Sequence, residues 1–141
     1  MQPERNKIVM DTNIVVSAAI STDGTPAKIF ELFLNKKIVN YTSKGIINEI
    51  EEVINRPAFR EYISDEYKKF ILDSFKLNSV VVKPAIDEKA VPEDEADNKF
   101  VNCALSVKAD IVSGDKHLKE LKHYKGINIW CAKDFLDRFE E

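Results

Sequence analysis

The sequence Ile8-Val9-Met10-Asp11-Thr12-Asn13 changes abruptly from apolar to polar residues. The apolar run predicts a short buried strand, and Asp11 would then lie at the carboxyl edge of a sheet. A second apolar run, residues 109–113, ends in the same way at Gly114 and Asp115. The two runs predict two strands of one sheet, each followed by an acid.

Predicted strands and helices alternate along the chain. Strands are predicted at residues 8–10, 38–41, 80–82, 109–113 and 127–130. Helices are predicted from Thr25, from Ser43 to about residue 55, from Ser64, and at 94–108, 116–122 and 133–140, with Thr25, Ser43 and Ser64 as capping residues. This alternation is typical of the α/β class, with a mostly parallel sheet of about five strands between helices on both faces.

Composition and charge place limits on the kind of protein. The chain has 141 residues, 44% of them hydrophobic, and carries 24 acidic against 21 basic side chains for a net charge of −3. Such a chain suits one globular domain over residues 1–141. The isoelectric point of about 5.5 disfavours a strongly basic nucleic-acid binder.

The sequence also predicts the location of the protein. No apolar run approaches the roughly 20 residues that a membrane helix needs, and the polar start lacks the pattern of a secretory signal. We therefore expect a cytoplasmic protein without a membrane partner. Its two cysteines, Cys103 and Cys131, are expected to be reduced.

A third acid, Asp97, is predicted to face the interior. It precedes the apolar positions Phe100, Val101, Ala104 and Leu105 by three, four, seven and eight residues, which places it on the apolar face of its helix. A buried charge is costly unless it is paired or binds a metal. The alternative is an acid of the first helical turn that is stabilised by the helix dipole.

The helix that begins at Ser43 contains Glu49, Glu51 and Glu52. Glu52 points nearly opposite the apolar stripe of that helix and is expected to be solvated. Glu49 and Glu51 lie at the two rims of the stripe, and periodicity does not choose between them.

Several carboxylates without a histidine or cysteine cluster indicate a hard cation. Oxygen ligands suit Mg²⁺ and Mn²⁺, and such ions bind phosphate oxygens and activate water. His117 and His123 are the only histidines and have no zinc spacing. Taken singly, Asp11 and Asp115 are better explained as helix caps or turn residues, and only the pair at the edge of one sheet favours a site.

The motifs in this order resemble those of a PIN domain, and most closely those of VapC-like toxins. The motifs are Asp11-Thr12-Asn13, the helix with Glu49, the segment Asp97-Asn98-Lys99-Phe100, and Ser113-Gly114-Asp115. The resemblance implies a three-layer α/β/α fold and a metal-dependent endoribonuclease that uses Mg²⁺ or Mn²⁺ and leaves a 5′-phosphate and a 3′-hydroxyl.

The resemblance also implies roles for individual residues. Asp11, Glu49, Asp97 and Asp115 match the catalytic and metal-binding acids, which selects Glu49 over Glu51. Asn13 and Ser113 match the supporting polar residues, and Asp94 is an auxiliary acid. The implied partners are an RNA substrate, an antitoxin protein and a second copy in a homodimer.

One departure leaves an alternative open. Many VapC-like proteins carry a second acid two residues after the last one, where this chain has His117, and this puts a second metal ion in doubt. A catalytically degenerate PIN-fold module that binds RNA or protein is therefore the alternative. A second alternative is a phosphatase of the haloacid-dehalogenase type, which also has an Asp after its first strand. Such a phosphatase would need an acid two residues after Asp11, where this chain has Asn13.

Basic residues near the predicted loops and helix starts are candidates for holding the substrate. They are Lys36, Lys37, Lys44, Arg56, Lys99, Lys116 and Lys119. If the four matched acids form one pocket, the 24 acids fall to 20 against 21 basic side chains. The net charge then no longer argues against RNA, but it predicts that RNA binding requires a metal ion.

Overall fold

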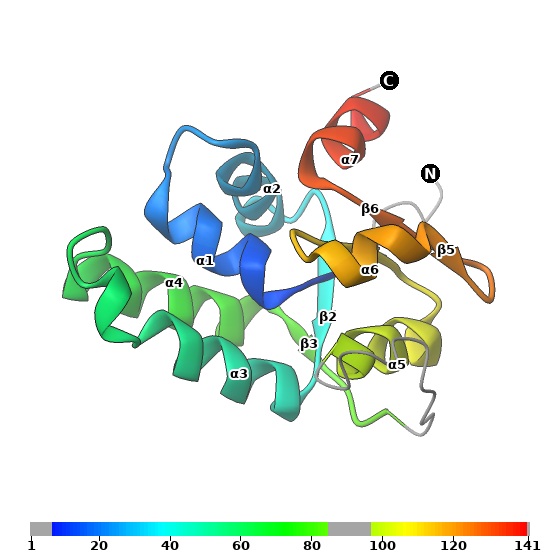
Figure 1. Ribbon diagram of the computed structural model, residues 1–141, viewed down its shortest axis with the longest axis horizontal. Coiled ribbons are helices and arrows are strands. Elements are labelled where there is room, and N and C mark those ends of the chain that lie inside the picture. Colours follow the sequence, from blue (N-terminus) through cyan, green and yellow to red (C-terminus); the bar gives the residue numbers. More distant parts are fainter. Residues whose placement is uncertain (1–6, 85–96, 141) are drawn as a thin grey trace.

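The computed structural model describes residues 7–84 and 97–140, apart from the side chains of Lys116 and His117. Within these residues a six-stranded sheet has the order β3-β2-β1-β4-β6-β5 (Figure 1). Its strands are β1 (Lys7–Met10), β2 (Val39–Thr42), β3 (Val80–Val81), β4 (Asp110–Val112), β5 (His123–Tyr124) and β6 (Ile127–Trp130). Neighbouring strands are parallel except β5 and β6, which confirms the predicted α/β class. Asp94 and the His117 side chain lie outside this description.

The strand that the sequence did not predict is β5, which forms a tight hairpin with β6. Lys125 and Gly126 connect the two strands, and both have a positive φ, 45° and 89°. Two positive-φ residues between paired strands are typical of a two-residue hairpin turn. A strand of only two residues has no alternation of apolar and polar side chains, so nothing in the pattern indicates it.

Helices follow most of the strands. They are α1 (Thr12–Ile20), α2 (Thr25–Leu34), α3 (Lys44–Ile54), α4 (Asp65–Asn78), α5 (Asn98–Val107), α6 (Lys116–Leu121) and α7 (Ala132–Phe139). Ser43 and Ser64 cap α3 and α4 as predicted, accepting hydrogen bonds from backbone N–H groups at 3.3 and 3.1 Å. The prediction that Thr25 caps α2 is wrong, because the N-cap is Gly24 and Thr25 is already helical.

Helix α1 was also not predicted, and its burial explains why. Of its nine residues, six are buried, including Ile14, Val15 and Val16 in succession. A helix that is apolar on most sides has no polar stripe and therefore no amphipathic signature. It begins directly after β1, so Asp11 stands at the junction of the strand and the helix.

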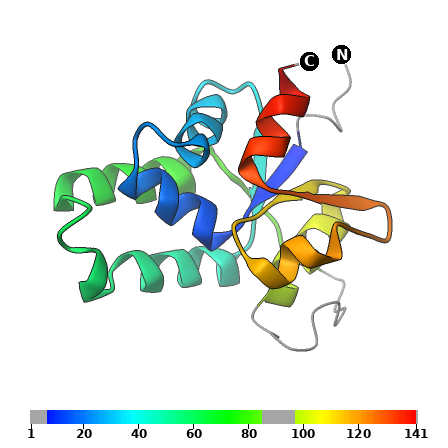
Figure 2. The same ribbon diagram turned by 45° about the horizontal axis from the view of Figure 1, so that its top comes forward.

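The arrangement of the elements determines where a site can form. Helix α5 packs against β1, β2 and β4, and helices α1 to α4 form a separate group (Figures 1 and 2). From β1, the strands β2 and β3 are added on one side of the sheet, and β4 and β6 are added on the other side. The parallel neighbours β1 and β4 therefore mark the point where the strand order reverses. In open parallel sheets the functional crevice lies at the carboxyl ends of the strands beside such a reversal.

Two further expectations concern the cysteines and the membrane. Both cysteines are free thiols, as predicted. Burial raises the pKa of the Cys103 thiol to about 12, so this group stays protonated. Across the described part of the chain, every helix is too short or too polar to cross a membrane.

A buried side chain, Asn40 of β2, joins the three strands on one side of the sheet. Its carbonyl oxygen accepts a hydrogen bond from the backbone N–H of Met10 in β1 at 2.8 Å. Its amide nitrogen donates to the hydroxyl of Ser79, just before β3, at 2.9 Å. The Asn40 side chain therefore holds the end of β1, directly before Asp11, to β2 and to the residue that precedes β3.

We expect Asn40→Ala to lower the free energy of unfolding by about 2 kcal/mol, because it leaves the buried Met10 N–H without an acceptor. Urea unfolding monitored by circular dichroism measures this change. Asn128→Ala, at an exposed position of β6, is the control and should change stability by less than about 0.5 kcal/mol. Equal losses in the two variants would contradict the role assigned to Asn40.

Candidate active site

The four acids matched in sequence line one cavity of about 200 Å³. Asp11 comes from the end of β1, Glu49 from α3, Asp97 from the residue before α5, and Asp115 from the loop after β4. The other lining residues are Thr12, Asn13, Val53, Arg56 and Phe100. The cavity, hereafter the acidic cavity, lies at the predicted carboxyl edge of β1 and β4.

Asp11 is the most enclosed of these acids, with 2% of its surface exposed. One carboxylate oxygen accepts from the backbone N–H of Ile14 at 3.0 Å, which caps α1. The other accepts from the Ser113 hydroxyl at 2.6 Å and the Gly114 N–H at 3.1 Å. The capping role that the sequence left open therefore exists, and the same carboxylate also lines the cavity.

Ser113 connects two of the acids from behind the cavity. Its hydroxyl donates to Asp11 and accepts from the backbone N–H of Asp115 at 2.8 Å. Asp115 in turn accepts from the N–H of Leu118 at 3.1 Å. This chain of hydrogen bonds fixes the relative positions of the Asp11 and Asp115 carboxylates.

Gly114 and Asn13 meet at the rim of the cavity. A Cβ added at Gly114 would lie 3.1 Å from the Cβ of Asn13, closer than nearly all real contacts of this kind. Glycine therefore allows the loop after β4 to come close enough for its N–H to reach Asp11. Asn13 is exposed and lines the cavity.

Glu49 and Glu51 of α3 have different partners in the structure. Glu49 accepts a hydrogen bond from the Thr12 hydroxyl and pairs with the Lys99 ammonium at 2.6 Å. Glu51 instead pairs with Lys76 of α4 at 2.8 Å, outside the acidic cavity. Only three-dimensional packing distinguishes these two glutamates.

Asp97 is buried, as its position on the apolar face predicted, with 6% of its surface exposed. It occupies the N-cap position of α5, but its side chain makes no capping hydrogen bond. Glu52 is exposed, also as predicted, and pairs with Arg56 at 2.9 Å.

Two lining residues extend what the sequence indicated. Thr12 was part of a motif but had no assigned role, and its hydroxyl proves to hold Glu49. Arg56 was one of seven basic candidates, and it lines the acidic cavity. Periodicity could not have shown either position, because the contact of Thr12 with Glu49 joins two helices and the acidic cavity is formed by several elements.

Burial dominates the electrostatics of Asp11. It raises the pKa of this carboxyl from 3.8 to about 6, although hydrogen bonds from Ser113, Ile14 and Gly114 act in the opposite direction. The nearby charge of Asp115 raises the pKa further. Near neutral pH, the acidic cavity therefore holds a buried charge that a cation would stabilise.

The donor set fits a hard cation in its chemistry. The four acidic lining residues offer carboxylate oxygens, which suit Mg²⁺ and Mn²⁺. Among the described residues, no three acidic, histidine or cysteine side chains converge as direct ligands of one metal. Mg²⁺ usually keeps several waters and contacts only one or two carboxylates, so a cavity lined by separated acids fits a hydrated ion.

Comparisons with known proteins agree with the geometry. A family model described as "PIN domain" matches residues 7–117. The chain is also similar to the uncharacterized protein MJ1680 of Methanocaldococcus jannaschii, with 39% identity over 150 aligned positions. That alignment covers the whole of this chain and 96% of the relative.

The raised pKa of Asp11 predicts a pH-dependent stability in metal-free buffer. The folded chain binds this proton more tightly than the unfolded chain, so the stabilisation is complete below about pH 4 and is lost as the pH rises to about 6. Because the amide in Asp11→Asn does not titrate, we expect the free energy of unfolding of this variant, relative to wild type, to rise by about 2 kcal/mol between pH 4 and pH 7.

Urea unfolding in a chelator at the two pH values measures this difference. Asp73→Asn removes an exposed acid of α4 and is the control, with an expected change below about 1 kcal/mol. A difference between Asp11→Asn and wild type that does not vary with pH would contradict the raised pKa.

Proposed function

We propose a function from one premise: the chain belongs to the PIN-domain family. Membership in this family indicates a nuclease-type function. We propose more specifically that the protein is a metal-dependent endoribonuclease that hydrolyses RNA phosphodiester bonds. The observation that carries the proposal is the acidic cavity, in which four acids from distant parts of the sequence meet at the carboxyl ends of β1 and β4.

In the proposed mechanism, Asp11, Asp97 and Asp115 would hold Mg²⁺ or Mn²⁺ directly or through water. When bound, the ion would neutralise phosphate charge and lower the pKa of water. Ser113 keeps the carboxylates of Asp11 and Asp115 in position through its hydroxyl and its contact with the Asp115 N–H.

Glu49 is proposed to orient the attacking water and accept its proton. One of its oxygens is held by Thr12 and the other by Lys99, so the carboxylate has a defined direction. The water oxygen bonds to phosphorus while the bond from phosphorus to the 3′-oxygen breaks, and the released 3′-oxygen takes up a proton from solvent. The products are a 5′-phosphate and a 3′-hydroxyl.

The resemblance to VapC-like toxins extends the proposal to the biological setting. We propose a cytoplasmic toxin of a toxin–antitoxin pair that forms a homodimer and is inhibited by an antitoxin protein. A small reading frame next to the coding gene, whose product binds this protein and blocks RNA cleavage, would support this setting. Without such a partner, a housekeeping nuclease would be the better assignment.

Two glutamates of α3 give a matched test of the proposed active site. Both pair with a lysine and differ by two positions, but only Glu49 lines the acidic cavity. We expect Glu49→Gln to lower kcat for RNA cleavage roughly 100-fold or more, the usual contribution of a general base. Glu51→Gln should keep wild-type activity, and its unchanged thermal unfolding would show that it folds normally.

The assay measures cleavage of labelled RNA with Mn²⁺, with Mg²⁺ and with a chelator. Cleavage should require a metal ion and should be abolished in Asp11→Asn and Asp97→Asn. Full activity in either of these variants would refute the assignment of the acids. RNA binding without cleavage under all conditions would instead favour the degenerate binding module.

A further inference from the structure

A second cavity, of about 610 Å³, lies beside the acidic cavity. It is formed by the first turn of α3, the chain just after β3, and α5, which lie near one another in Figures 1 and 2. Its lining residues are Ser43, Lys44, Gly45, Val81, Val82, Lys83, Pro84, Lys99 and Asn102. It is hereafter the basic cavity.

The charge of the basic cavity is opposite to that of the chain as a whole. Lys44, Lys83 and Lys99 line it, and none of its lining residues within the described part of the chain is acidic. The whole chain carries a net charge of −3. Because Lys99 is paired with Glu49, Lys44 and Lys83 are the cations of this hollow that attract a polyanion.

An apolar surface lies beside these lysines. Val81, Val82 and Pro84 form one wall, and 53% of the Val81 surface is exposed. Cations next to an apolar wall match a nucleotide, whose phosphate is anionic and whose base has a flat and largely apolar face.

One ion pair connects the two cavities. Lys99 lines the basic cavity, and its ammonium lies 2.6 Å from the carboxylate of Glu49, which lines the acidic cavity. A strand that enters the acidic cavity therefore passes directly beside the basic one. Lys99 and Glu49 thus form the border between the two cavities.

We infer that the basic cavity binds the nucleotide of single-stranded RNA next to the phosphodiester that is cleaved. Lys44 and Lys83 contact its phosphates, and its base packs against Val82 and Pro84. This inference rests on the proposed function, because it assigns the neighbouring acidic cavity to the cleavage step. It adds a substrate-binding subsite, which favours RNA that is unpaired at this position, since a base in a duplex would first have to be unpaired and unstacked.

The first test removes the two lysines at the outer side of the basic cavity. In the double variant Lys44→Ala/Lys83→Ala, we expect the Kd for a fluorescent single-stranded RNA decamer to rise about tenfold in low salt. The salt dependence of log Kd should become shallower by about 1.4, which corresponds to two lost phosphate contacts on a single strand. In cleavage assays KM should increase more than kcat decreases.

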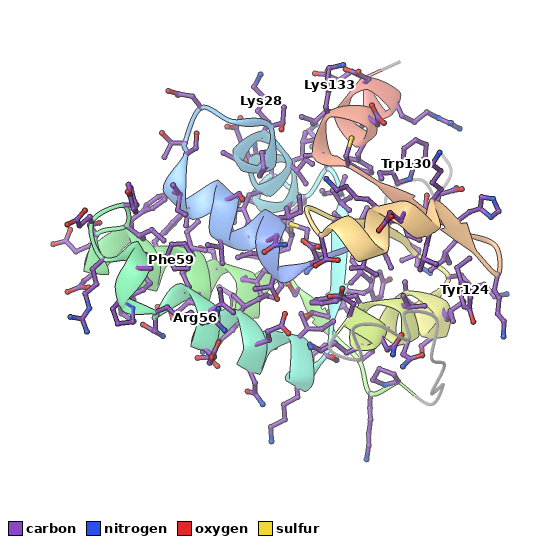
Figure 3. All side chains as sticks on the ribbon, in the orientation of Figure 1. Lys28, Arg56, Phe59, Tyr124, Trp130 and Lys133 are labelled. Atoms are coloured by element: carbon purple, nitrogen blue, oxygen red, sulfur yellow. The ribbon has the colours of Figure 1, made fainter. Side chains whose placement is uncertain are left out.

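The matched control is Lys28→Ala/Lys133→Ala, which changes the net charge by the same amount. Figure 3 shows both lysines at the α2 and α7 end of the molecule, away from α3 and α5. Affinity for the decamer and cleavage should stay within about twofold of wild type in this variant. An effect as large as that of the first double variant would mean that only total charge matters, and would overturn the inference.

A second variant fills the cavity without changing its charge. A Cβ at Gly45 would lie 3.9 Å from the Lys99 side chain, an ordinary contact, so Gly45→Met places a long side chain in the hollow without strain at the backbone. Methionine is also a better helix former than glycine, so the fold should be at least as stable. We expect weaker decamer binding with unchanged or raised thermal stability.

The outcomes separate this inference from the proposed function. If wild type cleaves RNA but both cavity variants bind and cleave like the control, the basic cavity is not a subsite and the nuclease assignment stands. If wild type neither binds nor cleaves RNA with a metal ion, both are refuted. Preference for the single-stranded decamer over the same sequence in a duplex, lost in Gly45→Met, supports the inference.

Discussion

The hydrogen bonds around the Asp11 carboxylate are the constraint on which the site depends. They join the end of β1, the start of α1 and the loop after β4 through one buried side chain, with contacts to Ile14, Ser113 and Gly114. The backbone N–H of Asp11 also donates to the carbonyl of Val112 at 3.1 Å. Both central strands therefore end in fixed positions, and the remaining acids are arranged around that fixed point.

Two cavities of opposite charge lie on either side of the Glu49–Lys99 ion pair. Between them they offer what the proposed phosphodiester hydrolysis would need, namely carboxylates for a cation and lysines for phosphates. Their proximity also resolves the question raised by the net charge. Four acids line the acidic cavity, and a chain that is acidic overall still has lysines grouped beside it.

The sequence predicted the elements and residues whose signals are local. Buried strand ends located Asp11 and Asp115, helical periodicity placed Asp97 in the interior, and serine caps located the starts of α3 and α4. Contacts between different helices and strands leave no such local pattern in the sequence. Glu49 and Glu51 lie on equivalent rims of one helix, and only Lys99 and Lys76, from different helices, give them different surroundings. Helix α1 was missed because burial on most sides removes its periodicity, and β5 because it is too short to have one.

The outer strand β3 has a consequence for the behaviour of the protein at high concentration. Its valines, Val80 and Val81, are about half exposed at the edge of the sheet, and an exposed apolar edge is a template for pairing with other chains. The strand has only two residues, and Pro84, which has no N–H to donate, follows three positions later. The edge that borders the basic cavity is thus too short to nucleate an intermolecular sheet, and this brevity protects the protein against aggregation.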